Sequence, residues 1–162
     1  MLDENFRLIL VRSMPLDRED YAKLRSAFQF LEERYVVPAL PTLAPEHRAS
    51  AVLARQEKES IASAQRGLAM AINDMVEALQ DLSPAEVAEC DRALEAQGSY
   101  TLSALRQRYS KQYRRIIERA AICSDEEFYL AQGVLSDTSL PLPDSEKILL
   151  DRLIHAYRPE ET

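Results

Sequence analysis

"IASAQRGLAMAINDMVEALQDL", residues 61–82, is the stretch that decides the fold. Large apolar side chains recur in it seven residues apart, and small alanines follow three positions later. This is the heptad spacing of a helix that packs closely against another helix. No proline interrupts the stretch, and its one glycine is Gly67. The predicted helix-association seam consists of Ile61, Ala64, Leu68, Ala71, Met75, Ala78 and Leu82.

The proline-free run continues towards the N-terminus as far as Pro45. It predicts one long central helix over about residues 45–82, or two helices broken near Gly67. The first half of this run lacks the apolar seam. A helix of that length outreaches a compact domain of this size, so we expect its N-terminal part to be exposed or to pack on a second subunit. The seam favours packing inside a single helical bundle, and self-association as a homodimer with coiled-coil character is the alternative, to which the exposed-looking residues 47–60 point.

Caps and prolines predict the other helices. Asp17 has the position of an N-cap, and Pro38 ends the helix that follows it. Ser83, with a proline next and a glutamate three residues on, predicts a capped helix that stops before Gly98. Further helices are expected over residues 101–121, 124–136 and 144–158. Residues 3–13 fit neither the helix nor the strand period, and we expect a short helix or a packed extended arm there.

Together these patterns predict an all-α protein, a helical bundle of about six helices with no secure β-sheet. Only 3 glycines, with 46% hydrophobic and 29% charged residues, are typical of a helical globular chain. We expect a single domain over residues 1–162. A sub-division into an extended helical hairpin (residues 1–82) and a compact helical part (residues 83–162) is possible within it.

The totals also bear on location and partners. The net charge of −7 argues against a surface built as a whole for nucleic acid or anionic lipid. No uncharged apolar run approaches the ~20 residues of a membrane span, and no signal peptide is evident at the N-terminus. Two cysteines are too few for a disulfide framework and indicate reduced thiols. The expectation is a cytoplasmic protein without a membrane partner.

Positive charge gathers in the predicted helix over residues 101–121. Six basic residues against one acid, Glu118, give residues 106–119 a charge of +5. At 100° per residue, Leu105, Tyr113 and Ile116 share a core face, and the tyrosines are not interleaved with the cations as base-stacking side chains would be. The candidate stripe for an anionic partner consists of Arg108, Lys111, Arg115 and Arg119. Solvent or the chain's own acids are its favoured counterparts, ahead of an acidic protein and of nucleic acid.

Signatures of catalysis and metal binding were sought without success. The sequence has no glycine-rich phosphate loop and no G-x-S-x-G or H-E-x-x-H pattern. His47 and His155 have no second ligand nearby in the sequence, so no cofactor or metal is predicted. We expect a non-enzymatic helical protein–protein interaction or regulatory protein, whose partner is another protein or a second copy of the chain. The alternative is a small nucleic-acid-associated regulator that uses the basic helix at residues 102–120.

Overall fold

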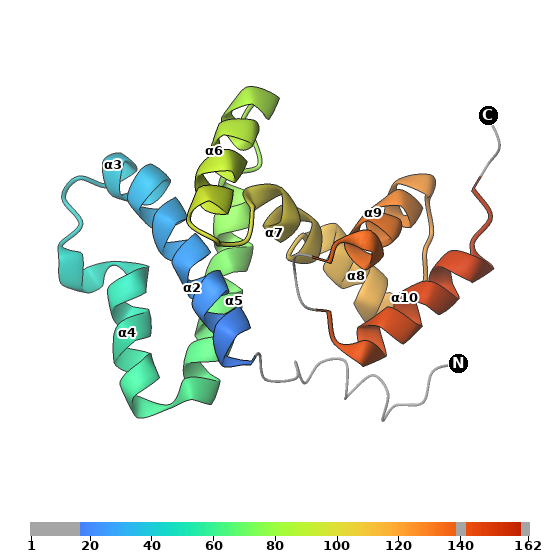
Figure 1. The fold of residues 1–162 in the computed structure, drawn as a ribbon, viewed down its shortest axis with the longest axis horizontal. Coiled ribbons are helices and arrows are strands. Elements are labelled where there is room, and N and C mark those ends of the chain that lie inside the picture. Colours follow the sequence, from blue (N-terminus) through green and yellow to red (C-terminus); the bar gives the residue numbers. More distant parts are fainter. Residues whose placement is uncertain (1–16, 139–141, 160–162) are drawn as a thin grey trace. The chain divides into compact units, whose positions relative to one another are not determined.

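The structure is a computed structural model, and it describes residues 17–138 and 142–159 (Figure 1). Every regular element within these ranges is a helix, and they contain no strand. The all-α prediction is thereby confirmed. The prediction for residues 3–13 lies outside the described residues.

The chain divides into two compact units. The N-terminal unit comprises the described residues up to Leu105, and the C-terminal unit begins at Arg106. The boundary lies inside helix α7 (Leu102–Arg108). Each unit has buried residues of its own, and each is described by itself below; the single-domain organisation stays a prediction.

Helix α2 (Arg18–Leu31) begins where its cap predicts. Asp17 Oδ1 accepts the backbone N–H of Asp20 at 2.8 Å, which satisfies one of the free donors of the first turn. One apolar face of α2 is buried in the N-terminal unit. That face consists of Leu24, Ala27, Phe28 and Leu31.

A π-helix, η1 (Glu32–Val36), continues α2, and the short α3 (Val37–Ala39) follows it. Glu32 is 2% exposed, and both of its carboxylate oxygens accept the backbone N–H of Ser50, at 3.2 and 3.3 Å. Ser50 lies in the first turn of α4 (Ala49–Glu59), which has no side-chain cap of its own. The carboxylate of Glu32, which belongs to η1, therefore accepts a hydrogen bond from the first turn of α4 in place of an N-cap side chain.

The predicted long central helix over residues 45–82 is wrong. The chain forms a 3₁₀ turn, η2 (Pro45–His47), then α4, then α5 (Ile61–Ala78). Ser60 separates the last two, with an extended backbone (φ −159°, ψ 115°), and its Oγ accepts the N–H of Ser63 at 3.3 Å. Because Ser60 caps α5 in this conformation, α4 folds back and packs along α5 as a hairpin (Figure 1).

The break therefore lies at Ser60 and not near Gly67. Gly67 is in the middle of α5, where a Cβ atom would lie 2.6 Å from Oε1 of Gln56 in α4. The missing side chain leaves room for the side-chain amide of Gln56 against α5.

The N-terminal part of the predicted central helix, residues 47–60, is exposed only in part. Leu53 of α4 is buried at 4% exposure. Glu57 accepts hydrogen bonds from two side chains of α2, Tyr21 at 2.8 Å and Arg25 at 2.9 Å. Helices α2 and α5 of the same chain thus pack against α4, where the sequence predicts exposure or a second subunit.

Helix α6 (Pro84–Ala96) agrees with its local signals. Ser83 and Glu86 form a reciprocal capping box, and Gly98 follows the helix with φ +72°. A left-handed residue at this place closes the helix end, and glycine adopts it without steric cost. The hydroxyl of Tyr100 then donates to Asp20 at 2.8 Å and ties the end of this region to α2.

The predicted single helix over residues 101–121 is wrong as well. It consists of α7 and α8 (Lys111–Arg119), separated at Tyr109 and Ser110. Ser110 has extended backbone (φ −70°, ψ 150°), and its Oγ accepts the N–H of Tyr113 at 3.0 Å. A new helix therefore starts at Lys111, and the left-handed Ala120 (φ 53°) ends it.

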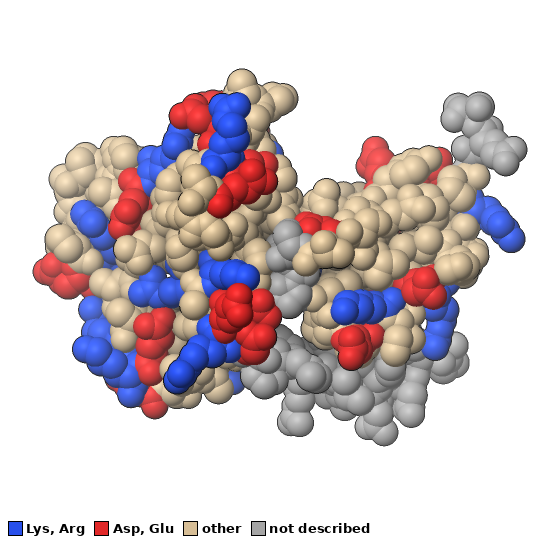
Figure 2. Space-filling model, viewed as in Figure 1, with Lys and Arg blue, Asp and Glu red and all other residues tan. Residues whose placement is uncertain are grey.

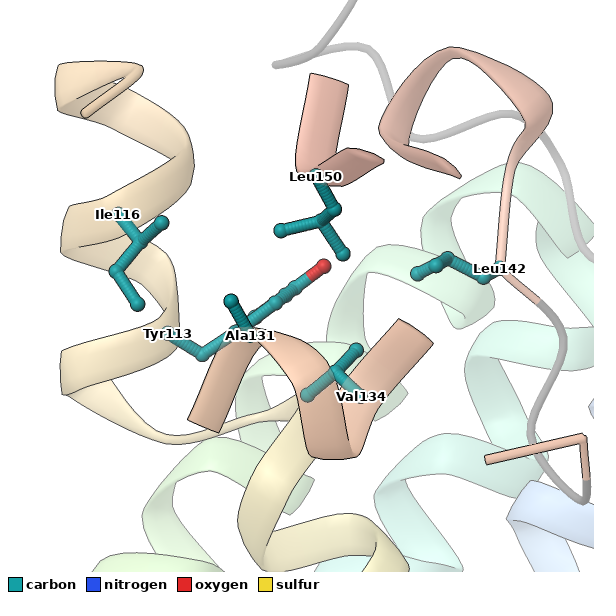
Figure 3. Close-up of a cluster of buried hydrophobic side chains, with 6 residues drawn as sticks. All are labelled: Tyr113, Ile116, Ala131, Val134, Leu142 and Leu150. Carbon is teal, nitrogen blue, oxygen red and sulfur yellow. The ribbon is translucent and has the colours of Figure 1, made fainter. Parts of the chain in front are cut away.

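The C-terminal unit packs α8 against α9 (Asp125–Ser136), and α9 against α10 (Asp144–Ala156). Figure 3 shows the buried cluster, with the Tyr113 ring reaching between Ala131 and Leu150. Its other labelled members are Ile116, Val134 and Leu142. The predicted core positions Leu105, Tyr113 and Ile116 are buried, as expected.

Candidate interaction surfaces

The predicted stripe Arg108, Lys111, Arg115 and Arg119 is not one continuous surface. Arg108 belongs to α7, while the other three belong to α8, and the Ser110 break separates them. Arg108 forms an ion pair with Glu146 of α10, and Arg119 forms one with Glu127 of α9. The favoured counterpart, an acid of the chain itself, is therefore present for Arg108 and Arg119.

Arg108 belongs to a partly buried polar cluster around Glu146, which is 8% exposed. The guanidinium donates from Nη2 to Glu146 Oε1 at 3.1 Å, and the Tyr113 hydroxyl donates to Oε2 at 2.8 Å. The same guanidinium lies 5.2 Å from the centroid of the Tyr113 ring and 5.7 Å from that of Tyr109. Burial, and then the negative charge of Glu146, raise the pKa of Tyr113, so its hydroxyl stays a donor at neutral pH.

Arg119 is held in a similar way at the start of α9. Its Nη2 donates to Glu127, a residue 9% exposed, and to the carbonyl of Ala121 at 3.0 Å. Glu127 also accepts the backbone N–H of Cys123 at 2.7 Å. The Arg119 charge thus joins α8 to the first turn of α9 and is largely compensated there.

The outward face of α8 carries a different set of charges. Lys111, Arg114 and Arg115 are exposed, and Glu118 is exposed one turn further on. These four residues are spaced i, i+3, i+4 and i+7, so they share one side of the helix. The stripe predicted from the sequence omits Arg114. It includes Arg108 and Arg119 instead, and these two positions centre the predicted stripe on another side of the helix.

The predicted association seam is mostly inside the N-terminal unit. Ala64 and Leu68 are 0% exposed and Met75 is 6% exposed, all packed in the chain's own core. Ile61, by contrast, is 56% exposed. The remaining members are Ala71 and Leu82, which are partly exposed, and Ala78, which is exposed. Self-association through the seam stays a prediction.

An exposed apolar turn joins α3 to η2 and was not singled out from the sequence. Residues 35–45 contain no charged side chain, and Leu40 is 51% exposed. Figure 2 shows mostly uncharged surface at the upper left, over α3. Val52, in the first turns of the following α4, adds a further exposed side chain at 38%. The exposed residues of the apolar turn are Pro38, Ala39, Leu40, Pro41, Thr42 and Pro45.

The backbone of the apolar turn is ordered by its own hydrogen bonds. Leu40 N–H donates to the carbonyl of Val36 at 3.0 Å, and Leu43 N–H donates to that of Leu40 at 3.0 Å. The prolines fix φ at three further positions. The spacing of Pro38 and Pro41 resembles a polyproline II ligand, but Pro38 lies in α3, so the turn presents helical and turn conformations instead. In the sequence, these prolines indicate only where helices end. The exposure of the apolar turn could not be predicted, because it depends on tertiary packing.

The described residues contain no group of three or more His, Cys, Asp or Glu side chains placed to hold a metal ion. Cys90 and Cys123 do not form a disulfide bond. Within residues 17–138 and 142–159, no helix has the length and apolar character required to cross a bilayer. Comparisons with protein-family models, curated proteins and solved structures find no match to this chain.

Proposed function

We propose that the protein is a non-enzymatic helical interaction protein, and that its partner is a protein that docks on the apolar turn. The observation that carries this proposal is the exposure of Leu40 in a turn with no charged residue from position 35 to 45. Contiguous apolar surface of this kind marks interaction sites on soluble proteins. A turn whose backbone is already ordered also loses little conformational entropy when it binds.

The buried carboxylates support the same proposal. Glu32, Glu127 and Glu146 each accept hydrogen bonds from backbone or side-chain groups of other elements, which assigns them to holding helices together. Catalytic carboxylates are placed instead where a substrate can reach them. A second copy of this chain is one partner that the apolar turn can accept, and this continues the homodimer expectation on a different surface from the seam.

The test replaces Leu40 by Asp, alone and together with Val52→Asp. Ile148→Asp is the matched control, because Ile148 is 58% exposed but belongs to the C-terminal unit. A photo-crosslinking residue at position 40 would capture partners in cells, and sedimentation velocity at micromolar concentration would report self-association. We expect a defined protein or a second copy to be captured at position 40, and its binding to fall on Leu40→Asp but not on Ile148→Asp.

The proposal would be overturned if no protein is captured at position 40, or if a captured partner binds the Leu40→Asp variant as tightly as the unchanged chain. Circular dichroism of each variant separates loss of binding from loss of fold. Nucleic-acid binding, the alternative function, has less support because Arg108 and Arg119 are paired with the chain's own acids. Titration with duplex and single-stranded nucleic acid at low salt tests it, and binding that weakens steeply with salt would favour it.

A further inference from the structure

Ser60, the residue between α4 and α5, takes part in the backbone hydrogen bonds of both helices. Its N–H donates to the carbonyl of Gln56 at 2.8 Å, as in a continuation of α4, and its carbonyl accepts the N–H of Ala64 at 3.0 Å. The break is therefore confined to the dihedral angles of one residue, φ −159° and ψ 115°. Turning these angles into the helical range would join α4 and α5 into one helix over residues 49–78.

The end of α4 lacks the stop signals that close α6 and α8. Those two helices end at Gly98 (φ +72°) and Ala120 (φ 53°), and a helix cannot continue through a left-handed residue. In the described part of the chain these are the residues with positive φ, so α4 ends without one. Residues 46–66 also contain neither proline nor glycine. The local sequence thus favours a continuous helix, and the hairpin depends on packing.

Residues 17–59 hold together as one piece, here called the swapping segment. Glu57 of α4 accepts a hydrogen bond from the hydroxyl of Tyr21 in α2 at 2.8 Å. Glu32 of η1 accepts the backbone N–H of Ser50 in α4. An opening of the α4–α5 hairpin would leave these bonds intact, because both partners of each bond lie before the break.

A second set of contacts holds the swapping segment against the residues that follow the break. Helices α2 and α4 both pack on α5 (Figure 1). The Tyr100 hydroxyl donates to Asp20 at 2.8 Å, and Arg34 forms an ion pair with Glu89 at 2.9 Å. A second copy of the chain presents the same groups in the same arrangement, so it can supply every one of these contacts.

We propose that the protein forms a domain-swapped dimer, in which α4 and α5 join at Ser60 and each swapping segment packs on α5 and α6 of the other copy. Short hinges favour exchange of this kind. Ile61, directly after the hinge, is 56% exposed in the monomer. In the dimer each α4 ends where the other copy's α5 begins, so the hinges lie side by side and cover Ile61. The exchange leaves Leu40 exposed, and the inference does not rest on the proposed function.

Chain concentration decides between the two forms. The hairpin closes within one chain, where a short link gives an effective concentration of about a millimolar. The dimer gains backbone hydrogen bonds at the hinge and buries Ile61, and both lower the concentration at which it forms. We expect the dimer to appear on refolding at high chain concentration. It should then persist on dilution, because both swapping segments must detach before either can return.

The first test refolds the full chain from urea at about millimolar concentration and measures its mass by light scattering. Ser60→Ala should raise the dimerisation constant by about tenfold or more, since the cap is lost in two monomers for every dimer formed. A short glycine linker inserted after Ser60 should abolish the dimer, because it interrupts the joined helix and lets the hairpin close. The matched control places the same linker after Asp81, in the exposed turn before α6, and should keep the dimer.

The second test mixes two variants, Arg34→Glu and Glu89→Arg, and refolds them together. Each variant alone has like charges at this contact, in the monomer and in a swapped homodimer. Heterodimers should therefore exceed the statistical proportion, because only a swapped heterodimer has opposite charges at both contacts. Dimers whose chains keep their own swapping segments gain nothing from mixing.

Three results would overturn the proposal. One is a chain that stays monomeric after refolding at high concentration, with Ser60→Ala equally monomeric. Another is a statistical proportion of heterodimers in the mixture. The third is a dimer that survives the linker after Ser60 and is lost on Leu40→Asp instead, which would assign self-association to the apolar turn. Circular dichroism of each variant confirms that its helices have formed.

Discussion

Glu146 is a single buried carboxylate that connects three helices of the C-terminal unit. Arg108 of α7 and Tyr113 of α8 donate to its two oxygens, and Glu146 itself lies in α10. Removing the carboxylate leaves a buried hydroxyl without its acceptor and a partly buried guanidinium without its counter-charge.

We predict that Glu146→Ala lowers the free energy of unfolding by about 2–4 kcal/mol, because breaking a buried pair from one side leaves the other side uncompensated. Tyr113→Phe should cost about 1 kcal/mol, since the ring and its packing remain and one hydrogen bond is lost. Urea unfolding of both variants and of the double variant measures the coupling. Strictly additive effects would contradict a shared cluster.

Interactions between residues close in the sequence could be predicted from the sequence, and interactions between residues far apart in the sequence could not. Ser83 and Glu86 lie three positions apart and form their capping box without outside help. The basic character of residues 106–119 was equally plain. Which of these cations face solvent depends on acids about 8 and 38 residues further along, at Glu127 and Glu146. Only the folded chain brings those acids close, so the predicted stripe combined paired and outward-facing residues.

At the level of helices, one substitution distinguishes the hairpin from a continuous helix, because the two structures predict changes in stability of opposite sign. Ser60 caps α5 with its side chain, so Ser60→Ala should destabilise the protein by about 1 kcal/mol. In an unbroken helix the same change would stabilise it, because alanine has the higher helix propensity. Thermal or urea unfolding of this variant decides between them, with Ser63→Ala as a control one turn away.

The two glycines of the N-terminal unit should respond differently to alanine. Gly98 has φ +72°, so Gly98→Ala should cost about 1 kcal/mol from backbone strain. Gly67 has ordinary helical backbone, and the atom nearest its missing Cβ is the mobile end of Gln56. Gly67→Ala should therefore lie within about 0.5 kcal/mol of neutral, with improved helix propensity offsetting the displaced side chain. Equal losses at both positions would refute this account.

The helix breaks at Ser60 and Ser110 were missed for a common reason. Each serine lies within a run that no proline interrupts, and a serine facing solvent in a helix looks the same in sequence. The packing of α4 on α5 and the Glu146 cluster favour the broken conformation at these points. The presence of a helix could therefore be predicted from apolar periodicity, whereas its length depends on tertiary contacts.

Among the residues that the structure describes, four tyrosine hydroxyls donate to carboxylates at 2.7–2.8 Å, and both units contain such pairs. The pairs are Tyr21 with Glu57, Tyr100 with Asp20, Tyr113 with Glu146 and Tyr157 with Asp125. Burial, followed by the neighbouring carboxylate, raises the pKa of Tyr21 and of Tyr113 above the usual range. The folded chain therefore keeps protons that the unfolded chain releases in alkali.

We predict that the titration of these tyrosines does not change the free energy of unfolding below about pH 10, where tyrosine is protonated in both the folded and the unfolded chain. Above that pH the unfolded state loses protons first, so the free energy of unfolding should fall as the pH rises towards the higher folded pKa values. Urea midpoints from pH 8 to pH 11 measure the fall. Tyr21→Phe with Tyr113→Phe should flatten it, and a wild-type midpoint unchanged at pH 11 would contradict the prediction.

The π-helix at Glu32–Val36 has a consequence for insertions and deletions. Its wider turn accommodates one more residue than an α-helix would in the same place. Deleting one residue there would let the backbone close into regular α-helix, with Leu24 and Phe28 upstream keeping their buried positions. The same deletion inside α2 would rotate every later side chain by about 100° and expose the core. This segment is thus the place in the first helix where homologous chains could differ in length by one residue and keep the fold.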